Sequence, residues 1–426
     1  MKRRTFLSAA AILGAASTLA ACGNDSKGTT GSAGSELAAD TTAELTLSYW
    51  DVNQTPTVEA AIAAFNKDFP NIKVTPSITT FRDYWTKLRT QAQGDNLPDV
   101  FWMNGPNIQL YASNGQLAEL DDMGVEWDKY PKALVDLYSF DGKHYGIPKD
   151  FDTIACWTNK KMLADAGVEV PEGDWTWEEF HAAAKAVSDG GAYGVVANLM
   201  TGGQSTYYNT IAQAGGFVVK DGVSGYDDPA TIEGLKKWAE LIADGSMAPV
   251  QVMTDTSPRD LFNAQKAAMH WTGSWEAPAI RENFSGDKGD VIALPLPTID
   301  GNKGSTIHGL SYVAASSSKN LAAAKKLVTY MASQESAETE AANGTAIPAY
   351  TGTQEKWASA DPEWNLNVFI DAAENYAVTY PVSKNTAAWN EKENELLVPA
   401  FQGNTDVEAA AKQLATDMNA LLAEEK

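Results

Sequence analysis

An alternation of strand and helix patterns early in the chain constrains its fold more than any other feature of the sequence. Apolar and polar residues alternate at 45–49 and again at 72–74, as they do in half-buried strands. Apolar residues recur at helical spacing over 58–69 and 85–92, and the mainly apolar run 99–103 is typical of a buried strand. This order predicts an α/β domain with a mostly parallel sheet and helices on both faces.

The rest of the chain continues with helical patterns separated by short strands. With about 100 to 200 residues per domain as a guide, a chain of 426 residues has room for two or three domains. Ligands of open sheets bind beyond the carboxyl ends of the strands, so the segments 50–53 and 102–104 are candidate binding loops. The further helices are expected at 177–188, 229–244, 321–333 and 407–423.

The charge balance argues against one class of partner. The chain has 32 Lys+Arg and 55 Asp+Glu, and its formal net charge is −23 at pH 7. A charge of this sign and size repels phosphate backbones, so we expect no nucleic-acid partner. It also favours a soluble protein, which we expect to be a monomer, with a neutral or cationic ligand.

The N-terminus has the composition of an export signal. Basic residues at 2–4 precede the uncharged segment 5–21, which is too short and alanine-rich for a membrane span. Residues 19–22 resemble a bacterial lipobox, in which the cysteine is acylated and begins the mature chain. We therefore expect a lipoprotein signal peptide at 1–21 and a lipid on Cys22 that anchors the exported protein to the outer face of the cell membrane. An ordinary cleavage site is the alternative, and export by the general or the twin-arginine route stays open.

A flexible tether is expected at 22–44, where Gly, Ser and Thr dominate and large apolar residues are scarce. Removal of 1–21 deletes three basic residues and no acidic ones, so the mature chain has a net charge of −26. Its only cysteine besides Cys22 is Cys156, so no disulfide is expected within the chain. The apolar surroundings of Cys156 predict a buried strand and an inert core thiol.

Catalytic and cofactor motifs are scarce. The sequence has neither the glycine-rich phosphate loop nor the G-x-G-x-x-G fingerprint of nucleotide-binding proteins. Its four histidines lie far apart and form no H-E-x-x-H motif, so we expect no metal site and no cofactor. We therefore expect no enzyme activity. A surface-anchored glycoside hydrolase remains the alternative, because the separation of two catalytic carboxylates cannot be read from a sequence.

Aromatic residues are the distinctive feature, since many of the 13 Trp and 15 Tyr residues stand beside small polar ones. Sugar rings have apolar C–H faces that stack on aromatic rings and hydroxyls that bond to Asp, Glu and Asn. The pairing therefore suits a neutral polyhydroxy ligand. The other interpretation of each position is a core aromatic with a polar handle. The stretches are 49–51, 102–104, 207–209, 271–276 and 389–391.

Five stretches of sequence, in this order behind the lipobox, resemble the extracellular solute-binding proteins (family 1) of bacterial carbohydrate ABC importers. The resemblance spans 45–422, which is nearly the whole mature domain. The stretches are 65–74, 84–100, 145–168, 175–180 and 273–275, with further support from 294–297, 318–320 and 346–349.

The resemblance implies a fold like that of periplasmic binding proteins. Two α/β lobes, each with a mostly parallel sheet flanked by helices, would be joined by three crossings of a hinge. A neutral sugar, in our interpretation an oligosaccharide, would bind in the cleft and be presented on closure to the permease subunits of an ABC transporter. A polyol or other non-sugar solute is the alternative ligand. The expected crossings are near 151–152, 311–312 and 346–347, the N-terminal lobe at 45–151 and 312–346, and the C-terminal lobe at 152–311 and 347–426.

Similarity to the maltose-binding members of the family implies roles for individual residues. Tyr208 would form an aromatic site and Asp152 a hinge carboxylate. Asn104 and Gly105 stand where the maltose binders have a charged pair, which argues against maltose as the ligand. The implied stacking positions are Trp102, Trp275 and Trp389. The full set of candidate ligand-binding residues is Trp50, Asp51, Asn53, Arg82, Trp102, Asn104, Asp152, Tyr207, Tyr208, Trp271, Gly273, Ser274, Trp275, Glu276, His308 and Trp389.

Overall fold

The computed structural model describes residues 37–200, 202–286 and 288–425. The expected signal peptide, Cys22 and most of the expected tether lie outside these residues. The first strand, β1 (Ala43–Tyr49), begins before the point at which the tether was expected to end. Leu45, Leu47 and Tyr49 are buried in this strand, as their alternation with polar residues predicts.

The predicted βαβαβ order is confirmed. β1 is followed by α1 (Thr55–Asp68), β2 (Ile72–Ile78), α2 (Phe81–Gln93) and β3 (Val100–Asn104). β1 pairs in parallel with both β2 and β3. A proline in the first turn of α1, whose missing N–H is not needed there, marks the point at which the helix begins.

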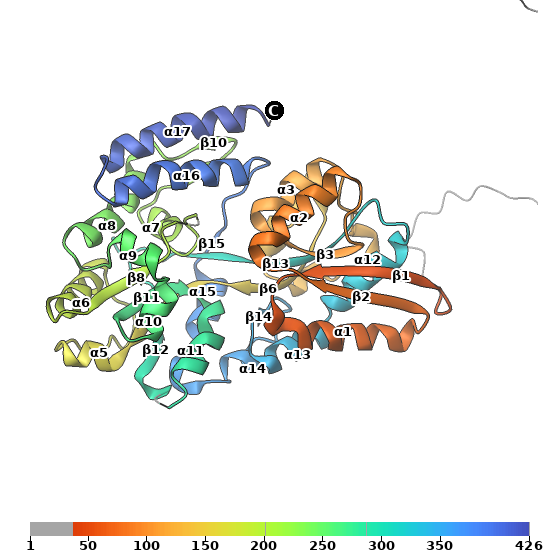
Figure 1. The fold of residues 1–426 in the computed structure, drawn as a ribbon, viewed down its shortest axis with the longest axis horizontal. Helices are drawn as coiled ribbons and strands as arrows, with labels where there is room; N and C mark the ends of the chain where they lie inside the picture. The colour runs from red at the N-terminus through yellow and green to blue at the C-terminus, as the bar shows by residue number, and fades with distance from the viewer. Residues whose placement is uncertain (1–36, 201, 287, 426) are drawn as a thin grey trace, which may run out of the picture. The chain divides into compact units, whose positions relative to one another are not determined.

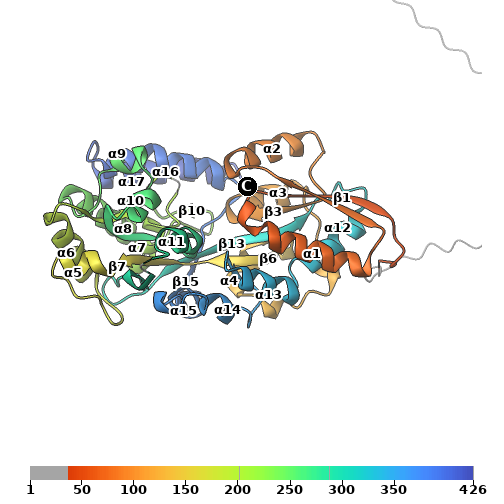
Figure 2. The same cartoon turned by 60° about the horizontal axis from the view of Figure 1, so that its bottom comes forward.

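Helices cover both faces of this sheet. α1 and α12 (Leu321–Met331) lie on one face, and α2 and α3 (Gly105–Ser113) lie on the other (Figure 1 and Figure 2). The buried side chains of α1 include Val58 and Phe65, which recur at the helical spacing seen in the sequence.

Strand β13 (Ser305–Ala314) is shared by two parts of the fold (Figure 1). Its first three residues pair in parallel with β15 (Ala377–Thr379), and from His308 onwards it pairs antiparallel with β6 (Ile147–Asp152) and then with β3. β6 also pairs antiparallel with β14 (Ile347–Pro348). The first sheet thus has the order β14-β6-β13-β3-β1-β2, with β15 beside β13. Pairing is parallel among β1, β2 and β3 and between β13 and β15, and it is antiparallel where the chain returns through β6, β13 and β14.

The second sheet has the order β12-β7-β11-β8 and is also mixed. β11 (Ala267–Gly273) runs parallel to β8 (Tyr193–Ala197), whereas β7 (Ile154–Asn159) pairs antiparallel with β11 and with β12 (Val291–Leu294). β7 follows β6 after the single residue Thr153. Two sheets with flanking helices make the two-lobe α/β fold expected from the sequence, and we call the lobes of the first and second sheets the N-terminal and C-terminal lobes.

The helices predicted from periodicity, which are α6, α8, α12 and α17, agree with their expected bounds to within two residues. Thr176 and Glu179 form a reciprocal capping box that fixes the start of α6. Within the described ranges, no helix has the length and apolar character needed to span a bilayer. The remaining elements are β4 (Ser139–Phe140), β5 (Lys143–His144), β9 (Val219–Lys220), β10 (Val223–Ser224), α4 (Lys132–Leu137), α5 (Lys160–Asp165), α6 (Trp177–Asp189), α7 (Tyr207–Gln213), α8 (Pro229–Ala243), α9 (Val250–Asp255), α10 (Pro258–Asn263), α11 (Ala277–Asn283), α13 (Gln334–Asn343), α14 (Glu355–Ala358), α15 (Asn367–Asn375), α16 (Thr386–Phe401) and α17 (Val407–Ala423).

Cys156 lies in the core, as predicted. It belongs to β7 and is fully buried. Burial raises the pKa of its thiol to about 12, and a hydrogen bond from Thr158 lowers it only partly. Because the thiolate is the reactive form, this cysteine is inert at neutral pH.

Candidate ligand-binding site

A cleft of about 980 Å³ is lined by residues of both lobes. Its floor is formed by Asp150 and Asp152 of β6, His308 and Leu310 of β13, and Ala346 just before β14. The hinge crossings expected near 151–152, 311–312 and 346–347 lie in or beside these three segments. The volume is at the upper end of the roughly 300–1,000 Å³ typical of small-molecule sites, which leaves room for more than one sugar ring.

The N-terminal lobe lines the cleft with three aromatic residues, Trp50, Phe81 and Trp85, which we call the aromatic wall. The ring centroid of Trp50 lies 5.5 Å from that of Phe81 and 5.7 Å from that of Trp85. Phe81 and Trp85 are four residues apart in α2 and therefore share a face of the helix. Phe81 is 54% exposed, so the wall offers apolar surface to a ligand.

Trp102 lies behind the aromatic wall and not on the cleft surface. Its side chain is fully buried, and its ring centroid lies 5.0 Å from that of Trp50. Lys149 Nζ lies 4.8 Å from the Trp102 ring centroid. Trp102 stands two residues before the end of β3, so Trp50 covers it, whereas Asn104 at the strand end reaches the cleft.

Polar groups of the same lobe are held in place by local hydrogen bonds. Asp51 accepts bonds from the backbone N–H of Asn53 (2.9 Å) and from Gln54 Nε2 (3.2 Å), which fixes the turn after β1. Asn104 Oδ1 accepts a bond from Asn107 Nδ2 at 2.8 Å. These five side chains all line the cleft.

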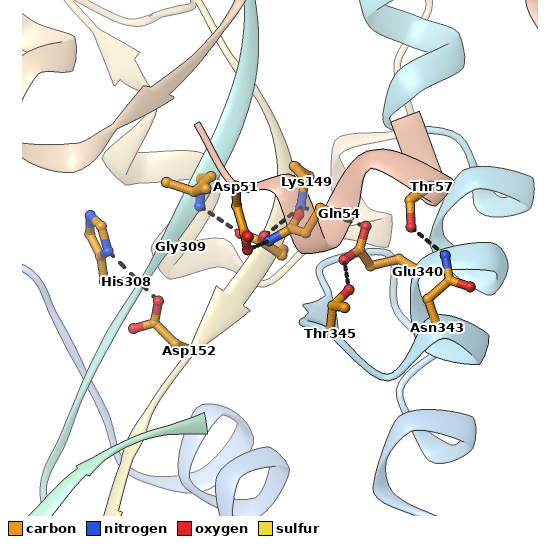
Figure 3. Close-up of polar contacts among 12 residues, drawn as sticks. Asp51, Gln54, Thr57, Lys149, Asp152, His308, Gly309, Glu340, Asn343 and Thr345 are labelled. Carbon is orange, nitrogen blue, oxygen red and sulfur yellow. Dashed lines mark hydrogen bonds and ion pairs between the residues drawn. The ribbon is translucent and has the colours of Figure 1, made fainter. Parts of the chain in front are cut away.

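A buried ion cluster includes a residue of the floor, Asp150, and its polar contacts are drawn in Figure 3. Lys149 Nζ lies 2.5 Å from an Asp150 oxygen, 3.6 Å from a Glu340 oxygen, and within hydrogen-bond distance of Gln54 Oε1. We call Lys149, Asp150 and Glu340 the ion cluster; all three side chains are at most 7% exposed. Burial opposes the charge of Lys149, but the two carboxylates raise its pKa above the ordinary value. Burial also raises the pKa of Glu340, against the effect of Lys149.

Asp152 and His308 meet where β6 and β13 cross the floor (Figure 3). Asp152 accepts a hydrogen bond from Gln204 at 2.7 Å, and its other oxygen lies 3.8 Å from His308 Nδ1. His308 Nε2 accepts the backbone N–H of Gly105 at 3.2 Å, so the ring proton of the neutral imidazole belongs on Nδ1, facing Asp152. Burial raises the pKa of Asp152, and His308 lowers it. The His308 ring also packs 4.9 Å from Tyr380, between centroids.

Trp275 is an aromatic residue of the opposite wall. It follows β11 in a single 3-10 turn and is half-buried on the cleft surface. Its ring lies against Gly273, where a Cβ atom would come within 2.0 Å of ring carbon Cζ3. Glycine at this position therefore allows the ring to lie over the strand end.

Glu276 lies beside Trp275 and forms a bidentate pair with Arg259 at 2.6 and 2.8 Å. Its side chain is only 5% exposed, so most of its hydrogen-bonding capacity goes to the guanidinium. His270 lies nearby in the cleft lining, and burial lowers its pKa to about 4, so it is neutral at physiological pH. On this wall the charge of Glu276 is therefore balanced by Arg259, and His270 adds none.

A second buried carboxyl lies behind this wall, in α16. Glu393 accepts hydrogen bonds from Tyr208 (2.8 and 2.9 Å), Tyr207 (3.4 Å), Tyr226 and Asn390 Nδ2 (2.8 Å). We call Glu393 with its three tyrosines the tyrosine cage. Burial raises the pKa of Glu393 to about 7, although the four donors act in the opposite direction.

The candidate residues divide into two groups in the structure. The side chain of Arg82 is outside the described part of the chain. Those that line the cleft are Trp50, Asp51, Asn53, Asn104, Asp152, Ser274, Trp275, Glu276 and His308. Those that lie elsewhere, buried, are Trp102, Tyr207, Tyr208, Trp271, Gly273 and Trp389.

The buried aromatic residues have partners inside the lobes. Trp389 donates its indole N–H to Ser383 Oγ at 2.9 Å, and Trp271 packs 5.0 Å from Trp238 between ring centroids. Tyr207 and Tyr208 donate hydrogen bonds to Glu393. All these residues were chosen from the sequence because an aromatic residue stands beside a polar one. That pattern does not show whether the aromatic or the polar side chain faces the cleft.

Several residues that line the cleft were not predicted from the sequence. Phe81 and Trp85 could have been, because their four-residue spacing puts two aromatic rings on one helix face. Arg89 follows Trp85 by four residues in the same helix, and Asn390 lies in the stretch 389–391, which the sequence singled out for Trp389. The others, which carry no local pattern, are Gln54, Asn107, Gln204, Arg259 and Tyr380. Across the described residues, no group of three or more His, Cys, Asp or Glu could hold a metal ion.

A cleft with its floor on the segments that join two α/β lobes defines a two-lobe binding protein. The chain belongs to the bacterial extracellular solute-binding protein family, whose family model matches residues 51–338. The family and its named relatives are binding proteins rather than enzymes.

Named relatives indicate the range of ligands in the family. The chain is 28% identical, over the whole of both chains, to the diacetylchitobiose binding protein DasA of Streptomyces coelicolor. It is 27% identical to the galactooligosaccharide-binding protein of Bacillus subtilis, covering 78% of this chain and 77% of that one. Its fold matches an ABC substrate-binding protein of Listeria monocytogenes, solved with cycloalternan, at a TM-score of 0.81 and 24% identity over 90% of this chain and 100% of that one.

Proposed function

We propose that this protein is a lipid-anchored extracellular binding protein that captures a neutral oligosaccharide and delivers it to the permease of an ABC transporter. The observation that carries the proposal is the aromatic wall facing a cleft that also exposes Trp275, above a floor of hydrogen-bonding groups. The names of the relatives support a sugar ligand. The lipoprotein relatives from Streptococcus pneumoniae support an anchor on Cys22.

The chemistry of the cleft suits sugars in two ways. Aromatic rings on two lobes can stack on the apolar faces of separate rings of one oligosaccharide. Asp51, Asn104 and Asp152 offer oxygen atoms to hydroxyl groups, which donate and accept hydrogen bonds. A ligand that contacts both lobes favours the closed state, because its contacts with the second lobe exist only there.

The proposed hinge follows the three segments of the cleft floor. The β6–β7 connection at Thr153 and the entry to β14 support crossings near 151–152 and 346–347. For β13, the change of partner from β15 to β6 at His308 supports a crossing a few residues before the expected 311–312. The proposed lobes are otherwise those expected from the sequence.

Calorimetry on the exported chain, with Cys22→Ala to prevent acylation, tests the proposal. Diacetylchitobiose, maltotriose, galactotriose and the polyol sorbitol are the probes. We expect at least one oligosaccharide to bind and to raise the melting temperature, with no product released on incubation. Release of shorter sugars would favour the hydrolase, and binding of sorbitol alone would favour the polyol alternative.

Replacement of Trp275 identifies the site. Loss of one stacked indole ring, at about 1.5–3 kcal/mol, corresponds to roughly 10- to 150-fold weaker binding. We expect Trp275→Ala to show this loss with an unchanged fold. Trp127→Ala is the matched control, because Trp127 stacks on His144 away from the cleft. Unchanged affinity of Trp275→Ala would remove Trp275 from the site.

A further inference from the structure

Asn390 connects the tyrosine cage to the cleft. It lines the cleft from α16, one turn before Glu393 on the same helix. Its Nδ2 donates to Glu393 Oε2 at 2.8 Å and to Tyr208 Oη at 2.9 Å. Neither Glu393 nor Tyr208 lines the cleft, so these two contacts lie behind the wall.

The hydrogen bonds of Asn390 determine which of its atoms is free for a ligand. A side-chain amide has two N–H donors and one carbonyl oxygen. Nδ2 makes both of these hydrogen bonds, the amide also interacts with the hydroxyl of Tyr380, and among the described residues no geometric hydrogen bond involves Oδ1. Oδ1 is therefore the atom that Asn390 has available for the cleft.

We propose that Glu393 is a positioning residue that fixes the Asn390 amide with its carbonyl oxygen toward the cleft, so that this side of the site selects ligand groups that donate a hydrogen bond. The proposal rests on the proposed sugar-binding function and deepens it. Hydroxyl groups and the N–H of acetamido groups are donors of this kind. Groups that only accept, such as ether oxygens and fluorine, are disfavoured there.

The charge state of Glu393 decides whether the amide is fixed. An ionised carboxylate can only accept hydrogen bonds, so it pairs with the N–H groups of Asn390. A protonated carboxyl can donate a hydrogen bond to Oδ1, which allows the amide to rotate by 180°. The titratable groups around Glu393 are Tyr207 and Tyr208 of α7, Tyr226 before α8, and Tyr380 after β15. In the described part of the chain, no charged side chain is hydrogen-bonded to Glu393. No ion pair therefore holds Glu393 in its ionised form.

A measurement without any sugar tests the coupling itself. In the ¹⁵N spectrum of the exported chain, the Asn390 side-chain amide is the signal that Asn390→Ala removes. We expect this signal to shift with pH around a midpoint near 7, following Glu393. We expect no such shift in Glu393→Gln. The exposed neighbour Glu391 gives the matched control Glu391→Gln, which should behave as the wild type. A signal that titrates in Glu393→Gln as it does in the wild type would overturn the proposal. A signal that does not titrate in either protein would mean that Glu393 keeps one charge state, and the double-mutant cycle below then decides whether it positions Asn390.

A double-mutant cycle with diacetylchitobiose as the probe tests the consequence for binding. We expect Glu393→Gln to weaken binding about three- to tenfold at pH 8, the effect of one hydrogen bond. In the Asn390→Ala background the same substitution should have no effect, because the residue that Glu393 positions is gone. An equal loss in both backgrounds would mean a merely structural role and would refute the proposal. If diacetylchitobiose does not bind, maltotriose and galactotriose serve as probes. If none binds, the proposed function fails and the spectrum alone decides.

Discussion

Two buried carboxyls near the cleft, Glu340 and Glu393, are stabilised in different ways. Glu340 is 2% exposed and faces the cation Lys149, with Asp150 as a second anion. Glu393 is fully buried and has only neutral donors, namely three tyrosine hydroxyls and one amide. Both acids have a raised pKa because burial is the largest influence on each.

The comparison shows what each arrangement can do. A cation in contact with carboxylates keeps its charge, so the ion cluster is a permanent part of the floor that joins β6, α13 and the turn after β1. Neutral donors stabilise a carboxylate without ensuring that it stays ionised. The tyrosine cage therefore holds an acid that gains and loses a proton near neutral pH.

Removal of the cation should have the largest effect. Lys149→Met leaves Asp150 and Glu340 buried without a counter-charge, and we expect a loss of about 3–5 kcal/mol in the free energy of unfolding. Chemical denaturation at pH 7 measures it. Lys132→Met, at an exposed i,i+4 pair, should change stability by less than about 1 kcal/mol. If Lys149→Met is too unstable to purify, the double variant with Glu340→Gln should recover part of the loss. A loss below 1 kcal/mol in Lys149→Met would contradict the assigned role of the cation.

The tyrosine cage should appear as pH dependence. The pKa of Glu393 is raised to about 7 from 4.5, so its contribution is fully present below pH 4.5 and is lost as the pH rises through 7. The expected loss between pH 4.5 and 8 is about 3 kcal/mol. In Glu393→Gln the difference in unfolding free energy between these pH values should shrink by that amount, while Glu391→Gln keeps the wild-type difference. An unchanged difference in Glu393→Gln would show that Glu393 is ionised throughout.

Removal of one anion from the ion cluster should have the smallest effect. Glu340→Gln leaves Lys149 paired with Asp150 and keeps an acceptor for Thr345, whose hydroxyl lies 2.7 Å from the Glu340 carboxyl. We expect a change of about 1 kcal/mol or less at pH 7, measured by the same denaturation experiment. A loss as large as that of Lys149→Met would mean that Glu340, and not Asp150, is the principal partner of the lysine.

The sequence predicted the local elements well and the site only in part. Periodicity located β1, α1 and the long helix α17, because each buries one face and the burial leaves its own spacing in the sequence. The antiparallel pairing of β6 with β13 leaves no such pattern in the sequence, because it joins segments more than 150 residues apart.

Residues of the site were predictable where they end a strand. Trp50, Asn104 and Trp275 follow β1, end β3 and follow β11, and all three line the cleft. Trp102 and Trp389 have the same kind of neighbours in sequence but face inward. The ion cluster and the tyrosine cage could not be found, because each collects side chains from segments that only the folded chain brings together.

Strand β13 has a consequence for how the chain tolerates changes in length. It pairs with β15 at one end and with β6 and β3 at the other, and at Gly309 a Cβ atom would lie 2.2 Å from the Asp150 carbonyl oxygen. A one-residue insertion or deletion here would turn every later side chain of the strand to the opposite face and displace the glycine from this close approach. A reporter domain inserted in β13 would therefore disrupt the fold. The exposed turn at 300–302, just before β13, is a better insertion site.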